Sequence, residues 1–255
     1  MQLTWSEAEC GVQIHSTSLP ASLQVIYIPF LVRGQTTATL IKADCLDALR
    51  EISGVDAVVT DPPYGNGDAG RYGRSQLGHR TIINDDNLEW LKPAAEAIYA
   101  ALKPKGHCIA FCQWRTFANF RDEFQAAGFG TKSLGVWDKC NAGLGAGVAE
   151  QWEGICFFRK GEIVERKFRG NVFTYPRISG RPEHPNQKPE TLMGALIELV
   201  SDEGDTILDP FMGSGSTGVA ALKGARNFVG IEKEWQHFRI ACRRIAAEMG
   251  QGTLL

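Results

Sequence analysis

Short strand-like stretches alternate with helical patterns along most of this chain, and this alternation limits the folds open to it. Seven stretches have the apolar, β-branched character of buried strands: 38–44, 56–61, 106–112, 131–138, 154–160, 205–211 and 227–232. Helical periodicity lies between most of them, most clearly where Trp235, Phe238, Cys242, Ile245 and Met249 recur at steps of three and four. The pattern predicts an α/β domain built on a doubly wound, mainly parallel, seven-stranded sheet with helices on both faces.

The composition is that of a soluble, folded protein, with 255 residues of which 44% are apolar and 22% charged. The longest apolar run, VIYIPFLV at 25–32, is too short to cross a bilayer, and the acidic N-terminal residues do not resemble a signal peptide. The seven cysteines are scattered without a C-x-x-C pair, so we expect Cys108 and Cys112 to pack in the core, no metal site, and a cytoplasmic location.

The expected domain organisation is an N-terminal extension at 1–37, with a strand at 23–32, followed by a catalytic domain at 38–255. Turn-rich segments interrupt that domain at 65–80, 141–150 and 161–185. Between Arg159 and Lys188 there are eight basic residues against three acidic ones, in a protein of net charge −2. Such a segment is either a solvated loop or a phosphate-facing surface.

A glycine-rich turn follows the strand at 205–211, in the sequence DTILDPFMGSGSTG. Gly213, Gly215 and Gly218 fit the G-x-G-x-x-G spacing, which lets a ligand approach the backbone at the start of a helix. Glu232 ends the next strand, where a carboxylate can accept hydrogen bonds from ribose hydroxyls. A dinucleotide and S-adenosylmethionine both suit such a site. Only 23 residues follow Glu232, so the other strands must precede the turn, an order unlike that of most dinucleotide oxidoreductases.

A second motif, VVTDPPYG at 58–65, places an acid, two prolines and a tyrosine at the end of another strand. If this strand lies beside the strand at 205–211, both motifs share one crevice. An exocyclic amine is a poor nucleophile until acceptors hold its hydrogens, and the Asp61 carboxylate and Pro62 carbonyl are such acceptors. Pro62 and Pro63 fix the backbone, and Tyr64 offers a ring for stacking on a flipped base. These demands match amine methylation.

DPPY followed far downstream by DPFMGSGSTG resembles the S-adenosylmethionine-dependent DNA amino-methyltransferases, in the subgroup whose catalytic motif precedes the cofactor motif. The similarity runs over about 41–248 and includes ADCLDAL (43–49), HPNQKPETLM (184–193) and GIE (230–232). It implies a Rossmann-like methyltransferase fold with a small target-recognition insertion. The expected reaction moves a methyl group from S-adenosylmethionine to a flipped adenine in a specific duplex DNA sequence. Asp61 at the first motif position favours adenine over cytosine.

The resemblance also implies roles for individual residues. The catalytic residues are Asp61, Pro62, Pro63 and Tyr64. The residues expected at the cofactor are Asp44, Cys45, Asp61, Lys188, Asp209, Phe211, Gly213, Ser214, Gly215, Ser216, Thr217 and Glu232. Among these, Asp44 and Cys45 would lie against the adenine and Lys188 near the carboxylate of the cofactor. Without the resemblance, Asp44 reads as a helix N-cap and Lys188 as a solvated lysine.

Sequence recognition would fall to 161–185, with help from 65–83 and 141–149. The expected DNA contacts are Arg71, Arg74, Arg80, Arg169, Arg177 and Arg181, with Arg71, Tyr72, Arg74 and Arg80 closing over the flipped nucleotide. A homodimer is compatible with the resemblance, because relatives often dimerise.

Three alternatives stay open at the level of sequence. A cytosine-N4 or RNA methyltransferase would use the same cofactor. A nicotinamide-dependent oxidoreductase would use the glycine turn but leaves DPPY unexplained. A DNA-binding module without catalysis is disfavoured by the intact motifs.

Overall fold

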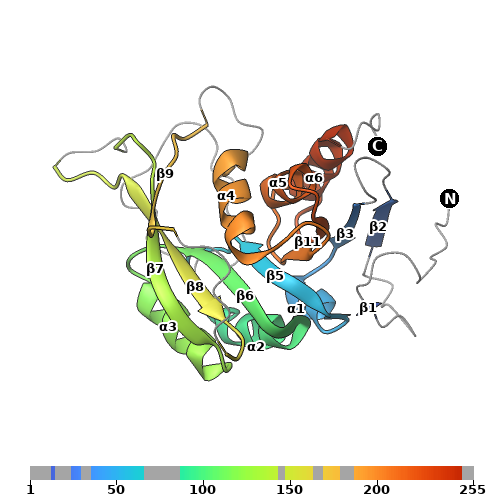
Figure 1. Ribbon diagram of the computed structural model, residues 1–255, viewed down its shortest axis with the longest axis horizontal. Coiled ribbons are helices and arrows are strands. Elements are labelled where there is room, and N and C mark those ends of the chain that lie inside the picture. Colours follow the sequence, from blue (N-terminus) through green and yellow to red (C-terminus); the bar gives the residue numbers. More distant parts are fainter. Residues whose placement is uncertain are drawn as a thin grey trace.

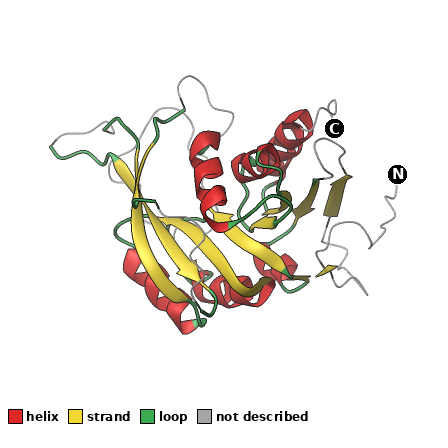
Figure 2. Ribbon diagram, viewed as in Figure 1, coloured by secondary structure: helices red, strands yellow, loops and turns green. Residues whose placement is uncertain are grey.

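A single large mixed sheet forms the centre of the protein (Figures 1 and 2). The computed structural model describes residues 36–65, 87–142, 147–162, 169–178 and 187–248 in full, and the backbone of 13–14 and 24–29. The nine strands of the sheet are, in spatial order, β2 (Gln24–Pro29), β3 (Thr37–Lys42), β11 (Asn227–Glu232), β10 (Thr206–Asp209), β5 (Val55–Thr60), β6 (Leu102–Cys112), β8 (Trp152–Arg159), β7 (Gly130–Asp138) and β9 (Val172–Thr174). A separate two-stranded pair joins β1 (Gln13–Ile14) to β4 (Ile52–Ser53).

All seven predicted strands are present, but the predicted count of seven is too low for this sheet. The central strands β3, β11, β10, β5 and β6 run parallel, whereas β8 is antiparallel to both β6 and β7. The two additional strands lie at the edges: β2 pairs antiparallel with β3, and β9 pairs parallel with β7. β2 lies within the strand expected at 23–32, which confirms that expectation, whereas β9 has only three residues, too few for a period to be visible.

Helices cover both faces of the sheet, as expected for a doubly wound fold. Figure 1 shows α1 (Cys45–Leu49), α2 (Leu91–Ala101) and α3 (Phe117–Ala126) on one face, and α4 (Glu190–Val200), α5 (Ser216–Lys223) and α6 (Trp235–Glu248) on the other. Because side chains alternate along a strand, β6 serves both cores. Cys108 and Ala110 point toward α2 and α3, and Ile109 and Phe111 toward α4. No helix in the described ranges is long and apolar enough to cross a membrane.

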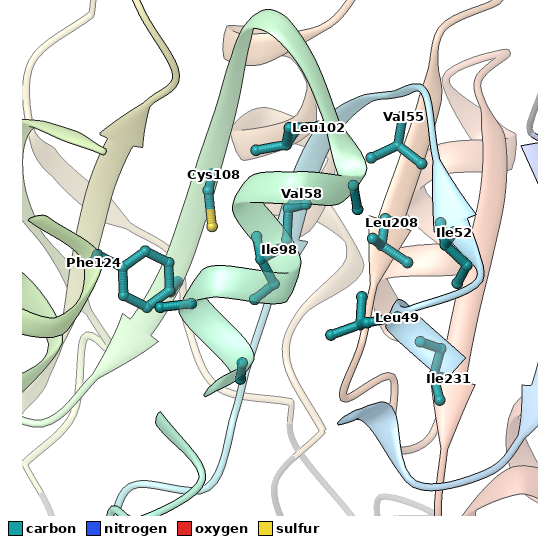
Figure 3. Packing of buried hydrophobic residues seen from close by; sticks show 14 of the residues in the cluster. Leu49, Ile52, Val55, Val58, Ile98, Leu102, Cys108, Phe124, Leu208 and Ile231 are labelled. Carbon is teal, nitrogen blue, oxygen red and sulfur yellow. The ribbon is translucent and has the colours of Figure 1, made fainter. Parts of the chain in front are cut away.

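The core under α2 and α3 holds Val58, Leu208, Ile98 and Phe124 in one packed cluster (Figure 3). Cys108 and Cys112 are fully buried, which confirms the prediction that they pack in the core. Burying such side chains removes about 25 cal/mol of unfavourable hydration per Å² of apolar surface, and this burial is the main force that holds helices on the sheet.

Helix α6 follows its predicted apolar stripe except at its first residue. Phe238, Cys242 and Ile245 are buried against the sheet, but the side chain of Trp235 is 46% exposed. Its ring stacks on Phe238 with the ring centroids 5.8 Å apart. The expectation that Trp235 belongs to the buried stripe is therefore wrong, and the buried stripe begins at Phe238. Met249 lies outside the described residues.

Candidate active site

The two motifs begin at the ends of neighbouring parallel strands, which confirms that they share one edge of the sheet. Strand β5 pairs with β10 through Val58 and Leu208. One residue before Asp61, the hydroxyl of Thr60 donates a hydrogen bond of 2.7 Å to Asp209 Oδ1. From β10 the chain crosses to β11 through α5, and from β5 it crosses to β6 through α2 on the opposite face. The order of strands therefore reverses between β10 and β5, where ligands bind in doubly wound sheets.

The glycine turn is held in a shape that only glycine adopts without strain. Gly213 and Gly215 have φ angles of +51° and +80°, in the left-handed region. The backbone N–H of Gly215 donates to the carbonyl of Met212 at 2.7 Å, and the N–H of Gly213 donates to Glu232 Oε2 at 3.0 Å. A Cβ at Gly213 would meet no atom within 4 Å, so this side of the turn is open.

The serines of the turn face away from that open side. Ser214 and Ser216 are 4% and 7% exposed, and the guanidinium of Arg244 in α6 binds both hydroxyls, at 3.1 and 3.3 Å. The same guanidinium nitrogen donates to the carbonyl of Ser214 at 2.6 Å, and Arg244 also pairs with Glu190 at 2.7 Å. The serines thus fasten the turn to α6 and α4.

Asp209 lies beneath the turn and ties it to β5. Its carboxylate accepts hydrogen bonds from the hydroxyls of Thr60 and Thr217, the latter at 2.6 Å, and from the N–H of Phe211 at 3.1 Å. Asp209 is 2% exposed, and burial raises its pKa to about 6 although the hydrogen bonds from the two threonines act in the opposite direction. Asp209 and Thr217 are therefore internal supports of the turn.

Glu232 closes the other side of the turn at the end of β11. Its Oε1 accepts a hydrogen bond of 2.5 Å from the N–H of Glu234, in addition to the bond from Gly213. Burial raises the pKa of Glu232 to about 7, against the effect of these two N–H donors. A carboxylate has about four acceptor positions, so Glu232 keeps acceptor capacity for a ligand.

The start of α1 borders the same edge, because the N–H of Ala43 donates to the carbonyl of Glu232 at 3.2 Å. Asp44 caps α1 by accepting from the N–H of Leu46 at 2.9 Å, which confirms the N-cap expectation, and it pairs with Lys233 at 3.0 Å. Burial raises the pKa of the adjacent Cys45 thiol to about 12, so this side chain is neutral and apolar in character.

Phe211 lies at the opposite border of the turn. Its ring meets the ring of Trp90 edge to face, with the centroids 5.0 Å apart. Trp90 is 7% exposed and belongs to the core under α2 and α3. The ring of Phe211 therefore packs against this core, while its backbone N–H is held by Asp209.

The DPPY motif carries a cluster of interacting polar side chains. The hydroxyl of Tyr64 lies 2.6 Å from Asp61 Oδ1 and 3.0 Å from Glu153 Oε2. The ammonium of Lys188 lies 2.5 Å from Asp61 Oδ2 and 3.2 Å from both Glu153 Oε2 and the hydroxyl of Tyr64. Both oxygens of Asp61 thus have partners from within the protein.

Lys188 is not a solvated lysine, since the residue is only 6% exposed. Its ammonium lies over the ring of Phe111, 4.9 Å from the centroid, and near the rings of Tyr64 and Trp137. Burial lowers its pKa, but the charges of Asp61 and then Glu153 outweigh burial and leave the pKa raised. Lys188 therefore stays protonated at the DPPY motif, and this is where the structure places the side chain expected near the carboxylate of the cofactor.

The two carboxyl groups of this cluster have pKa values displaced in opposite directions. Burial raises the pKa of Asp61 more than Lys188 lowers it, and the charge of Glu153 adds to the rise. Burial also acts to raise the pKa of Glu153, but Lys188 and then Lys139 lower it to about 2. Pairs of acids separated in this way are typical of functional sites.

The model of the N6_N4_Mtase family, described as DNA methylase, matches residues 55–243, which include both motifs. The chain belongs to this family of DNA methylases. The nicotinamide-dependent oxidoreductase that the glycine turn alone allowed is therefore wrong.

Individual relatives of this methylase agree with the assignment. A protein named "Putative methylase YubD" of Escherichia coli (strain K12) is 35% identical over 210 residues, 81% of this chain and 89% of that protein. "DNA adenine methyltransferase YhdJ" of the same strain is 26% identical over 253 residues, 83% of this chain and 84% of that protein. The crystal structure of the M1.HpyAVI-SAM complex has a TM-score of 0.66 at 26% identity and covers 82% of this chain and 98% of that one.

Two of the arginines predicted to contact DNA lie in the described part of this methylase, beside β9. The guanidinium of Arg169 donates to the hydroxyl of Tyr175 at 3.0 Å and stacks 4.9 Å from the ring centroid of Phe173. Arg177 is exposed on the same segment. Because β9 pairs with β7, this part of the expected recognition segment continues the catalytic sheet. The other predicted contacts lie outside the described residues: Arg71, Tyr72, Arg74, Arg80 and Arg181.

Sequence reasoning missed four residues of the site: Thr60, Lys139, Glu153 and Arg244. Each makes its contact across the fold rather than along the chain, so its role is not visible in the sequence even for Thr60, which lies within VVTDPPYG. One signal was available for Glu153 and Lys139, which stand at the start of one apolar strand and just past the end of another. A charged residue at such a position can face either solvent or a site, and the sequence does not distinguish the two.

Proposed function

We propose that this methylase transfers a methyl group from S-adenosylmethionine to the exocyclic amine of an adenine in duplex DNA. The observation that carries the proposal is the adjacency of Asp61 and the glycine turn at the end of the parallel strands β5 and β10. Two observations support adenine: the aspartate at the first position of DPPY, and the name of the adenine methyltransferase YhdJ, which aligns over 83% of this chain.

The residues at the glycine turn fit S-adenosylmethionine, the cofactor of this family, which supplies the methyl group when bound. The open side of Gly213 lets the ligand approach the backbone, and α5 begins there with N–H groups that its N-cap residue, Gly215, does not satisfy with a side chain. Glu232 would hold the ribose hydroxyls, and Asp44, Cys45 and Phe211 would border the ligand. Asp209, Thr217, Ser214 and Ser216 would support the glycine turn that the ligand contacts.

At the DPPY motif, Asp61 would accept one hydrogen of the adenine amine and the carbonyl of Pro62 the other. Pro62 is buried and Pro63 half-buried, and their fixed φ angles hold that carbonyl in place. The nitrogen loses one proton as it gains the methyl group, and a carboxylate whose pKa is raised by burial is suited to accept it. Tyr64 would stack on the flipped base.

The test is methyl transfer from isotopically labelled S-adenosylmethionine to genomic DNA from a methylation-deficient strain, with mass analysis of the nucleosides. We expect N6-methyladenine from the wild type and a loss of about 100-fold or more in turnover for Asp61→Ala, with cofactor binding retained. Asp122→Ala, an exposed position on α3, is the control and should keep full activity. Full activity in Asp61→Ala would defeat the chemistry, whereas N4-methylcytosine would keep the enzyme class and change the base.

Two further expectations stay predictions for this methylase. The cytoplasmic location is tested by cell fractionation, and the homodimer by sedimentation of the purified protein.

A further inference from the structure

Four charged side chains form a continuous buried chain that ends at Asp61. Lys139 Nζ lies 2.8 Å from Glu153 Oε1, Glu153 Oε2 lies 3.2 Å from Lys188 Nζ, and Lys188 Nζ lies 2.5 Å from Asp61 Oδ2. These side chains are only 8%, 19%, 7% and 22% exposed in that order, so water screens them weakly. Two cations balance two anions, and the chain is neutral as a whole.

Rigid strands hold the far end of this chain. Glu153 pairs across the sheet with Trp137, and Lys139 continues that pairing, because its N–H donates to the carbonyl of Gln151 at 3.0 Å. The next residue of β8, Gly154, pairs with Cys112 at the end of β6. The antiparallel strand β8 thus begins at the edge of the sheet where β5 and β6 end, and it brings Glu153 to the DPPY motif.

The contacts of Asp61 within the protein conflict with its proposed contact to the substrate, and Glu153 lies where it can take over some of them. Tyr64 occupies one oxygen of Asp61 and Lys188 the other, yet Asp61 must accept a hydrogen from the substrate amine under the proposed function. A tyrosine hydroxyl carries one proton, so Tyr64 donates to either Asp61 or Glu153 at a given moment. Glu153 Oε2 lies within 3.0 Å of that hydroxyl and 3.2 Å of Lys188, and Lys139 holds the other oxygen of Glu153.

We propose that Glu153, oriented by Lys139, is a positioning residue for methyl transfer: it takes the hydroxyl of Tyr64 and shares the ammonium of Lys188 while Asp61 binds the substrate amine. The inference rests on the proposed function, and it adds two residues outside both sequence motifs. Glu153 acts through Tyr64 and Lys188 and needs no contact with the base.

The arrangement also makes the charge of Asp61 depend on its neighbours. Among the described residues, the charged or titratable groups around Asp61 are Tyr64 in its own segment, Lys188 before α4, Glu153 on β8, Lys139 after β7 and Asp209 on β10. Removal of the negative charge at 153 should lower the pKa of Asp61, and removal of the positive charge at 139 should raise it. A merely structural role predicts no such opposite shifts.

The first experiment follows the titration of Asp61 by NMR in the full-length protein with ¹³C-labelled aspartate carboxyls, using Asp61→Asn to identify the signal. We expect the midpoint to move down by about one pH unit in Glu153→Gln and up by a similar amount in Lys139→Met. The double variant Glu153→Gln/Lys139→Met restores the charge balance, so its Asp61 should titrate near the wild-type midpoint. It replaces a single variant that folds poorly. Glu150→Gln, an exposed glutamate before β8, is the control and should leave the midpoint unchanged.

The second experiment measures methyl transfer to the same genomic DNA. Glu153→Gln should lose about 10- to 100-fold in turnover with the dissociation constant for S-adenosylmethionine within about twofold of the wild type. An unchanged Asp61 midpoint in both single variants, or full turnover in Glu153→Gln, overturns the inference. Since the NMR measurement needs no turnover, a wild type that fails to methylate DNA overturns the proposed function separately, and the titration still decides whether Glu153 controls Asp61.

Discussion

The hydroxyl of Thr60 donates a hydrogen bond of 2.7 Å to Asp209 Oδ1, although 149 positions separate the two residues. Thr60 and Asp209 are 1% and 2% exposed, and each is the last residue of its strand. Asp61 follows the first and the glycine turn follows the second. This buried hydrogen bond thus adds to the pairing of β5 with β10 in holding the acid and the turn side by side.

Asp209→Asn should remove a pH dependence from the stability of the protein. The pKa of Asp209 is raised from an ordinary value near 4 to about 6, so the folded state binds this proton more tightly than the unfolded state. The proton therefore stabilises the fold below about pH 4, and this contribution is lost as the pH rises through about 6. Asparagine stays neutral, and the hydroxyl of Thr217 can turn to accept from its amide.

The measurement is urea denaturation of wild type and Asp209→Asn between pH 4.5 and 7.5, values chosen to bracket a pKa of about 6. The free energy of unfolding of the wild type should fall relative to the variant by about 1–3 kcal/mol across this range. Asp122→Asn on the surface should follow the wild type. Parallel curves for wild type and Asp209→Asn would show that Asp209 titrates normally.

Glu232 should make binding of S-adenosylmethionine depend on pH. Burial raises its pKa to about 7, and the ionised carboxylate is the stronger acceptor for ribose hydroxyls. The carboxyl is protonated below that pH, so affinity should fall by up to about tenfold per pH unit as the pH decreases from 7. Calorimetric titrations from pH 5.5 to 8.5 test this, with values chosen to span about 7.

Glu232→Gln should bind S-adenosylmethionine more weakly than the wild type at high pH. It should also lose the part of the pH dependence of affinity that Glu232 causes. The exposed Glu203→Gln is the matched control and should keep the slope of the wild type. Equal slopes in wild type and Glu232→Gln would assign the pH dependence to another group, such as the amino group of the cofactor itself.

The sequence predicts the centre of this fold better than its edges. Strands such as β5 and β6 are recognisable in the sequence because burial on both faces requires continuous apolar runs. β9 does not, since the three residues Val172–Thr174 owe their extended form to β7, whose Val136 N–H donates to the carbonyl of Asn171. A strand whose extended conformation depends on pairing with its neighbour shows little strand-like pattern in its own sequence.

The same distinction separates the predicted and the missed parts of the site. Asp61 and Gly213 could be placed because each directly follows a strand, and parallel strands end at one edge. Glu153 meets Lys188 and Tyr64 because β8 runs antiparallel to β6, a direction that the residues of β8 do not encode. Lys188 was assigned by resemblance, and its charge remains with Asp61 because the carboxylates of Asp61 and Glu153 outweigh the effect of burial.

The first and third glycines of the turn should respond differently to alanine. Gly213 has a φ of +51° but open space at its Cβ position, so Gly213→Ala should cost about 1 kcal/mol of stability and weaken cofactor binding where the ligand approaches. A Cβ at Gly218 would lie 2.6 Å from Phe228 and 2.7 Å from Ile245. Gly218→Ala should therefore cost about 1–3 kcal/mol of stability through overpacking.

Thermal unfolding and cofactor titration of both variants separate the two effects. The expected result is a larger loss of stability in Gly218→Ala and a larger loss of affinity in Gly213→Ala, measured at a temperature where both are folded. The reverse pattern would mean that the ligand does not approach the turn from the open side of Gly213.

Arg169 provides a test of the proposed DNA contacts. Its guanidinium stacks on Phe173 and donates to Tyr175, which holds a positive charge beside β9 at low entropic cost. If it contacts a phosphate, Arg169→Gln should weaken binding of duplex DNA uniformly across sequences. The slope of log affinity against log salt concentration should fall by about 1. Arg121→Gln is the matched control, because Arg121 pairs with Asp122 on α3, a helix that lies away from β9 in Figure 1. A relaxed choice of methylated sites with an unchanged salt slope would instead assign Arg169 to the reading of a base edge.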